Sequence, residues 1–135
     1  MMRKQFLRLA ALSGFTAVIL GAFGAHALEN YISTDSIDSF NTGVRYQFIH
    51  TIMLAIIGVL GHFGRKSYLW YAGWLFFVGI ILFSGSIYLL SVKEIIDFGA
   101  WLGIVTPIGG TLFLAGWVCF FWATYSSFDR SQRPE

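Results

Sequence analysis

The sequence has few charged residues for its length. Only 12% of its 135 residues are Asp, Glu, Lys or Arg, whereas 56% are hydrophobic and 19% are aromatic. Soluble domains average about 25% charged residues, so this chain has too few charges to cover an ordinary soluble globule. The same composition excludes an intrinsically disordered chain, which combines low hydrophobicity with high net charge. The length allows one domain at most.

Several classes of functional motif are absent as well. The net charge is only +2 and no run of Lys and Arg exceeds two residues, so we expect no nucleic-acid partner. The single cysteine, Cys119, excludes an internal disulfide and a cysteine-based metal site. We find no nucleophile–base pair, phosphate loop or dinucleotide fingerprint. The sequence therefore predicts a protein that is not an enzyme, with no catalytic, cofactor-binding or metal site.

Four long segments contain no charged residue at all. They cover residues 9–28, 46–64, 67–92 and 98–128. A helix needs about 20 apolar residues to cross the bilayer core, whereas barrel strands would alternate apolar and polar residues, which these segments do not. The sequence therefore predicts an all-α integral membrane protein, a four-helix transmembrane bundle in a single domain, 1–135. The spans are expected near residues 7–28, 42–62, 68–91 and 100–124.

The basic residues predict the orientation of this bundle. With four spans, both termini and the 63–67 hairpin lie on one side. That side holds Arg3, Lys4, Arg8, Arg65, Lys66, Arg130 and Arg133, and the other side holds only Arg45 and Lys93. Because Lys and Arg are enriched in cytoplasmic loops, we expect both termini in the cytoplasm, N-in and C-in. In the long 29–41 loop, Ser33 or Thr34 is a candidate N-cap, so the second helix is expected to begin before the membrane.

Residues 1–27 admit a second interpretation, as a cleavable signal peptide. They combine a basic start with an apolar core and end in Ala25-His26-Ala27, an A-x-A pattern. The apolar run is long for a signal peptide, so we favour a retained first span. Cleavage would leave the other three spans in the same orientation.

Small residues at helical spacing predict close helix packing. In the first span, Gly14, Gly21 and Gly24 recur with Ala10 and Ala17 at steps of three and four residues. The fourth span repeats these steps with Gly99, Gly103, Thr106 and Gly110. Because small residues let helices approach in lipid, we expect the two stripes to face each other or the second span. Pro107 removes one backbone donor and predicts a kink in the fourth helix.

Polar side chains of all four spans share one depth zone, in the outer half of the membrane. They are His26, Gln47, His50, Ser84, Tyr88 and Thr106. We expect His50, Tyr88 and Thr106 to face the interior, with Gln47 and Ser84 close by. Two interpretations stay open: hydrogen bonds that hold the helices together, or an outward-facing pocket around His50 and Thr106 that binds or transports a small molecule or ion.

The histidines suggest further alternatives. His26 lies opposite the small-residue stripe of its helix, so it is expected to cap the outer end or bond to the 29–41 loop. An axial pair of His26 and His50 could hold haem iron, but no carboxylate is in view to orient either ring. Zinc catalysis needs three ligands, for which Glu29 is the one further candidate. We therefore rank redox and metal chemistry last.

These residues recur together in one family. Residues 21–26 read GAFGAH, and residues 40–47 read FNTGVRYQ, followed by His50. Residues 83–88 read FSGSIY, and residues 106–110 read TPIGG, followed by Gly116-Trp117. In this order and spacing the chain resembles the YgdD/YwdK-type family of small membrane proteins of unknown function.

The resemblance implies a four-span protein of the bacterial inner (plasma) membrane and brings no established activity with it. We therefore expect a non-enzymatic structural or accessory component of the lipid bilayer. Its partner is expected to be another membrane protein or a second copy of the chain. The alternative is a protein that binds or transports a small molecule or ion.

Overall fold

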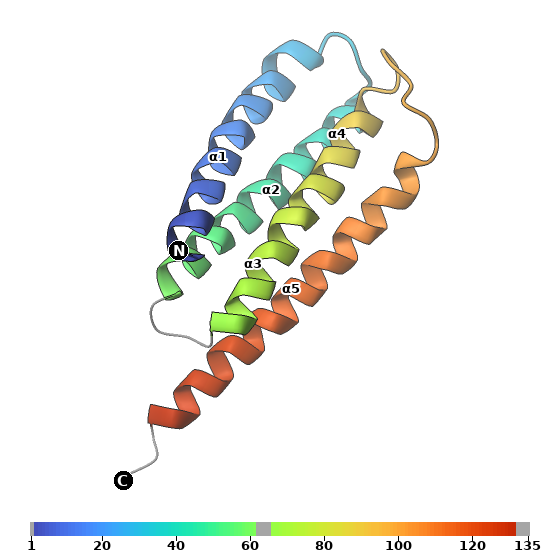
Figure 1. The fold of residues 1–135 in the computed structure, drawn as a ribbon. Helices are drawn as coiled ribbons and strands as arrows, with labels where there is room; N and C mark the ends of the chain where they lie inside the picture. The colour runs from blue at the N-terminus through green and yellow to red at the C-terminus, as the bar shows by residue number, and fades with distance from the viewer. Residues whose placement is uncertain (1, 62–65, 132–135) are drawn as a thin grey trace.

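The computed structural model describes residues 2–61 and 66–131, and these residues form long helices joined by short connections (Figure 1). Four helical segments are long and apolar enough to cross a membrane, and each overlaps one predicted span. They are Lys4–Leu28, Thr34–Leu60, Ser67–Ser91 and Leu102–Tyr125. The predicted all-α, four-span architecture is thus confirmed. The predicted 63–67 hairpin lies largely outside the described residues.

Two of the four spans contain a π-helical turn. The first span consists of α1 (Met2–Phe23) and the π-helix η1 (Gly24–Leu28), and the second is α2 (Thr34–Leu60). The third consists of α3 (Lys66–Gly79), the π-helix η2 (Ile80–Ser84) and α4 (Gly85–Ser91), and the fourth is α5 (Leu102–Ser131). The residues 29–33 and 92–101 connect the helices at the end opposite to the chain termini, which we call the distal end (Figure 1).

The ends of α2 and α5 have local causes. Ser33 is the N-cap of α2, and its hydroxyl accepts a hydrogen bond from the Ser36 N–H, so this helix begins eight residues before the predicted span. Gly99, which we counted in the small-residue stripe of the fourth helix, has φ +95° and lies in the connection, so α5 begins only at Leu102. The helix then continues through Pro107 without interruption. A kink at this proline stays a prediction.

The helices pack in chain order rather than as a closed ring. α1 packs along α2, α2 packs along the third span, and α5 packs along the other side of the third span (Figure 1). Among the described residues, no Cα atom of α1 lies within 8 Å of a Cα atom of α5. The expectation that the small-residue stripes of these two helices might face each other is therefore wrong, and each stripe has to be assigned to another neighbour.

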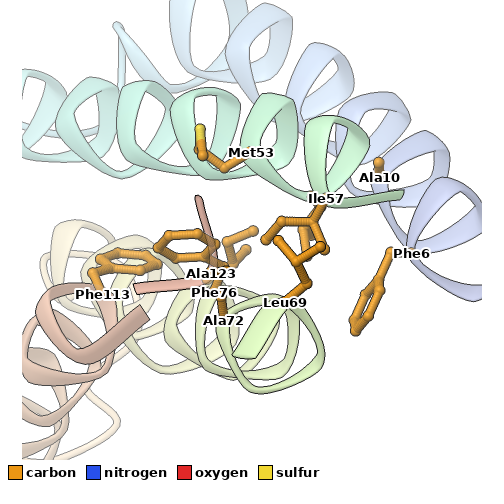
Figure 2. Close-up of a cluster of buried hydrophobic side chains, with 11 residues drawn as sticks. Phe6, Ala10, Met53, Ile57, Leu69, Ala72, Phe76, Phe113 and Ala123 are labelled. Carbon is orange, nitrogen blue, oxygen red and sulfur yellow. The ribbon is translucent and has the colours of Figure 1, made fainter. Parts of the chain in front are cut away.

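Apolar side chains fill the bundle in two clusters. The larger cluster, near the chain termini, draws on all four spans (Figure 2). Its largest fully buried members, each less than 2% exposed, are Phe6, Leu54, Ile57, Leu69 and Phe76. The smaller cluster, at the distal end, consists of Leu28, Ile32, Phe40 and Val44. Three buried polar side chains of α2, Gln47, His50 and Thr51, lie between these clusters in the sequence.

The glycines of α1 contact α2. This is one of the two arrangements expected for the first stripe, the one in which it faces the second span. A Cβ atom added at Gly14 would lie 3.5 Å from the Thr51 side chain, and one at Gly21 would lie 3.4 Å from Val44. At Gly24 the added atom would lie 2.8 Å from the Phe40 ring. The first stripe therefore packs on the second span.

The fourth span differs from the expectation. Nothing in the described chain lies within 4 Å of a Cβ atom added at Gly103, so the predicted close packing at this residue is wrong. Gly110 makes an ordinary 3.7 Å contact with the Phe83 side chain. The close approach is instead at Gly109, where an added Cβ atom would lie 2.7 Å from the Phe83 Cα. α5 presents its Gly109–Phe113–Gly116 face to the third span, and Gly103 does not lie on that face.

Candidate functional site

The amide of Gln47 is the centre of the buried polar network. Its Nε2 donates hydrogen bonds of 2.9 Å to the Ser13 carbonyl oxygen and 2.9 Å to the Thr16 Oγ1. Its Oε1 accepts a 2.7 Å hydrogen bond from the Tyr88 hydroxyl. Gln47 is only 4% exposed, so these bonds replace the hydrogen bonds to water that the amide loses on burial. One side chain of α2 thereby links α1 and α4.

A hydroxyl pair joins α1 and α2 directly. The Ser13 Oγ and the Thr51 Oγ1 lie 2.6 Å apart, and both residues are buried. We did not select Ser13, Thr16 or Thr51 from the sequence. The available signal was the position of Ser13 beside Gly14, on the helix face that carries Ala10 and Ala17.

His50 lies among aromatic rings rather than in the Gln47 network. Its ring is stacked on that of Phe113, with centroids 3.5 Å apart and an interplanar angle of 6°. The Phe76 ring lies 5.3 Å away, and the Trp117 ring meets it edge-on at 6.2 Å. The Nδ1 atom is 2.8 Å from the Tyr46 carbonyl oxygen in the same helix. The buried Nε2 atom has no hydrogen-bond partner among the described residues.

The remaining polar residues of the third and fourth spans form a separate group. The Ser86 Oγ and the Thr106 Oγ1 lie 2.7 Å apart and connect α4 to α5. The Ser84 side chain is fully buried, and its Oγ has no hydrogen-bond partner in the part of the chain that the structure describes. Ser84 is the last residue of η2, and π turns occur often at functional sites.

His26 does not belong to this interior. It lies in η1 and is exposed, in line with its expected place opposite the small-residue stripe of the first span. The predicted bond from the His26 side chain to the 29–41 loop is not among the side-chain hydrogen bonds of the described residues. The six predicted residues are therefore distributed over four places: the Gln47–Tyr88 network, the aromatic surroundings of His50, the Ser84 and Ser86–Thr106 region, and the exposed η1.

A cavity of about 440 Å³ opens at the distal end of the bundle. Its wall comes from the first turns of α2, from α4 with the following connection, and from Thr106 of α5. The lining residues are Asp35, Ser36, Ser39, Thr42, Ile87, Leu90, Ser91, Lys93 and Thr106. Thr106 thus lines an outward-opening cavity, as one interpretation of the sequence requires, but His50 is not part of the lining.

Glu94 fastens the 92–101 connection to the start of α2. Its carboxylate accepts hydrogen bonds from the Ser33 N–H at 3.0 Å, the Ser33 hydroxyl at 2.7 Å and the Ser36 hydroxyl at 2.7 Å. These bonds hold the pKa of Glu94 below its ordinary value, with the Ser36 hydroxyl as the largest cause and the charge of Lys93 as a smaller one. The contact fixes Lys93, the preceding residue, beside the cavity. Sequence reasoning did not pair Glu94 with Ser33 or Ser36.

The chemistry available at these places is hydrogen bonding and packing. Among residues 2–61 and 66–131, no three His, Cys, Asp or Glu side chains come together in a way that could hold a metal ion. His26 is exposed and His50 is buried in another part of the bundle, so the structure does not bring them together as a haem pair.

Comparisons with known proteins agree with the resemblance found in the sequence. The family described as "Protein of unknown function (DUF423)" matches residues 20–110. The UPF0382 membrane protein SAB0533 of Staphylococcus aureus (strain bovine RF122 / ET3-1) is 43% identical over 122 residues, covering 90% of this chain and 96% of the relative.

Two further relatives come from other genera. The UPF0382 membrane protein YwdK of Bacillus subtilis (strain 168) is 41% identical over 116 residues, covering 85% of this chain and 91% of the relative. A UPF0382 membrane protein of Haemophilus influenzae is 39% identical over 130 residues, covering 93% of this chain and 98% of the relative. No solved structure is significantly similar to this chain. With four membrane-spanning helices and these relatives, the chain belongs to the DUF423 family of UPF0382 membrane proteins.

Proposed function

We propose that this protein is a non-enzymatic component of the bacterial inner membrane, with both termini in the cytoplasm, that acts by associating with another membrane protein or with a second copy of itself. Its role in this proposal is structural or accessory. The interior holds the four helices in a defined arrangement, and the outer helix faces contact the partner.

The Gln47 network is the observation that carries this proposal. The amide and the hydroxyls around it bond to one another, from Ser13 and Thr16 in α1 to Tyr88 in α4. Interhelical hydrogen bonds of this kind hold membrane helices together at about 1 kcal/mol each. The polar groups of this network are therefore not free to meet a substrate, as those of a catalytic centre would be.

The proposed contact surface is the open side of α5. Only 17% of the residues in its most apolar segment are buried, against 50% in α2. Leu114 is 69% exposed and Val118 is 57% exposed, on the side of the helix away from the third span. In a membrane, van der Waals packing against another helix can cover such a face as well as lipid can.

Transport is the second candidate and has weaker support. A path for an ion or small molecule through the predicted polar zone would have to join His50 to Thr106. The distal cavity is lined by Thr106 and not by His50. We therefore rank association above transport.

Photo-crosslinking in the intact bacterial membrane tests the proposal. A photoreactive amino acid at Leu114 or Val118 is expected to give a discrete protein adduct, either a dimer of this chain or a complex of one other size. A probe at Phe15 of α1, which is 65% exposed, is the matched control on another lipid-facing helix. Adducts with lipid alone from both α5 positions would contradict the proposal.

A second arm separates a structural role of the interior from a chemical one. In the His50→Phe variant, the stacked ring on Phe113 is retained and the imidazole is removed. If the interior serves only to hold the helices, this variant keeps the adduct pattern of the wild type. Loss of the adducts in a variant that is folded and inserted would contradict a purely structural role for His50.

A further inference from the structure

We propose that the distal cavity binds the headgroup of a zwitterionic aminophospholipid, with the ammonium group at Asp35 and the phosphate at Lys93. This inference is independent of the proposed association through α5, because the two surfaces share no residue. It assigns a ligand to a cavity that lies at the end of the bundle opposite to the chain termini.

The size and position of the cavity suit a lipid headgroup. Its volume of about 440 Å³ lies within the range of roughly 300–1,000 Å³ that is typical of sites for small ligands. Along α2 the lining runs from Asp35 to Thr42, which is about 10 Å at a rise of about 1.5 Å per residue. The cavity therefore extends from the start of α2 into the depth where the membrane begins.

The cavity carries charges of opposite sign that form no ion pair with each other. Asp35 and Lys93 both line it, and neither forms an ion pair with any described residue. Glu94 is engaged by Ser33 and Ser36 instead, and this contact fixes Lys93 at the rim. A ligand that carries both a cation and an anion would satisfy both side chains, whereas an anionic lipid would satisfy only Lys93.

The apolar part of the wall favours a lipid over a soluble ligand. Ile87 and Leu90 lie on the α4 side of the cavity, next to its polar rim. The adjoining connection exposes Ile96 (55%) and Trp101 (61%), and aromatic and apolar side chains of this kind are typical of the boundary between lipid and water. The headgroups of one leaflet are therefore expected at the level of the cavity.

Lipid titration followed by native mass spectrometry tests this inference on the full chain in mild detergent. The probes are phosphatidylethanolamine, phosphatidylglycerol and soluble glycerophosphoethanolamine. We expect one phosphatidylethanolamine to bind per chain, more tightly than phosphatidylglycerol. Asp35→Asn should weaken the binding of phosphatidylethanolamine about two- to fivefold, which is the size expected of an exposed charge contact. The same substitution should leave the binding of phosphatidylglycerol unchanged. Lys93→Gln should weaken the binding of both lipids, whereas Lys93→Arg should bind both like the wild type.

Asp38→Asn is the matched control. Asp38 is an exposed acid on the same helix that does not line the cavity, so this variant should bind both lipids like the wild type. Equal effects of Asp35→Asn and Asp38→Asn, or no effect of Lys93→Gln, would overturn the proposal. Displacement of the lipid by glycerophosphoethanolamine at similar concentration would also overturn it, in favour of a soluble ligand. Because the substituted side chains are exposed, all variants should melt at the wild-type temperature.

Discussion

The Tyr88 hydroxyl donates a 2.7 Å hydrogen bond to the Gln47 Oε1, across 41 residues of sequence. The opposite side of the same amide donates to α1, at the Ser13 carbonyl oxygen and the Thr16 hydroxyl. Three spans are therefore connected through one side chain. Because lipid supplies no water to replace a lost partner, the energetic contribution of each bond depends on the other two remaining in place.

Removing either partner of this bond should destabilise the bundle. Tyr88→Phe keeps the ring that packs 4.7 Å from Phe40 and removes only the hydroxyl, so we expect a loss of about 1 kcal/mol in the free energy of unfolding. Gln47→Leu removes three hydrogen bonds and leaves the Ser13 carbonyl without this donor, so the loss should be larger, about 2–3 kcal/mol. Unfolding by sodium dodecyl sulfate in mixed micelles measures both.

Tyr31→Phe is the control for this pair, because Tyr31 lies in the distal connection and is 71% exposed. It should unfold like the wild type. The double variant should lose less than the sum of the single variants, since both remove the same bond. Additive losses, or a Tyr88→Phe variant as stable as the wild type, would show that the hydrogen bond contributes nothing.

Two glycines of α5 should respond in opposite ways to the same substitution. At Gly109 a methyl group would lie within 2.8 Å of the Phe83 Cα and Cβ, and backbone cannot move aside cheaply, so Gly109→Ala should cost about 1–3 kcal/mol. At Gly103 the methyl group meets nothing within 4 Å, so Gly103→Ala should be neutral, or stabilising by about 0.5–1 kcal/mol through helix propensity. Thermal unfolding in detergent compares them. Equal destabilisation would mean that α5 is rotated from the arrangement described here.

The positions of the spans could be predicted from the sequence because in lipid they depend on local composition. An uncharged segment of sufficient length has to be helical wherever it lies in the fold, and the segment around Leu102–Tyr125 meets that condition by itself. The N-cap at Ser33 is equally local, since it involves only a residue three positions later. Such features need no knowledge of neighbouring helices.

The face that each helix presents could not be predicted in the same way. Gly103 and Gly109 both lie in the glycine-containing part of α5, and only the position of the Phe83 backbone distinguishes them. The contact of Glu94 with Ser33 likewise depends on how two distant connections meet, 61 residues apart in sequence. Depth did identify Gln47, His50 and Tyr88 as residues of one zone, but not that the His50 ring stacks on Phe113 instead of joining the network.

The Glu94 contact should depend on pH in a defined direction. Its hydrogen bonds favour the carboxylate and lower the pKa in the folded protein, so the contact is complete at neutral pH and is lost as the pH falls through that lowered pKa. The amide resonance of Ser33, whose N–H donates to Glu94, reports this transition by NMR in micelles. Glu94→Gln should abolish it, and Glu29→Gln should leave it unchanged. A midpoint at or above the ordinary value for Glu would contradict the assignment.

The last prediction concerns orientation in the membrane. The distal side carries only Arg45 and Lys93, whereas seven basic residues belong to the side of the termini, so the distal connections should face away from the cytoplasm. In a Cys119→Ser background, cysteines at Asp38 or Ile96, both exposed, should react with an impermeant maleimide added to intact cells or spheroplasts. A cysteine at Lys4 should react only after the membrane is permeabilised. The reverse pattern would place both termini outside, and the cavity lined by Asp35 and Lys93 would then face the cytoplasmic leaflet and its lipids.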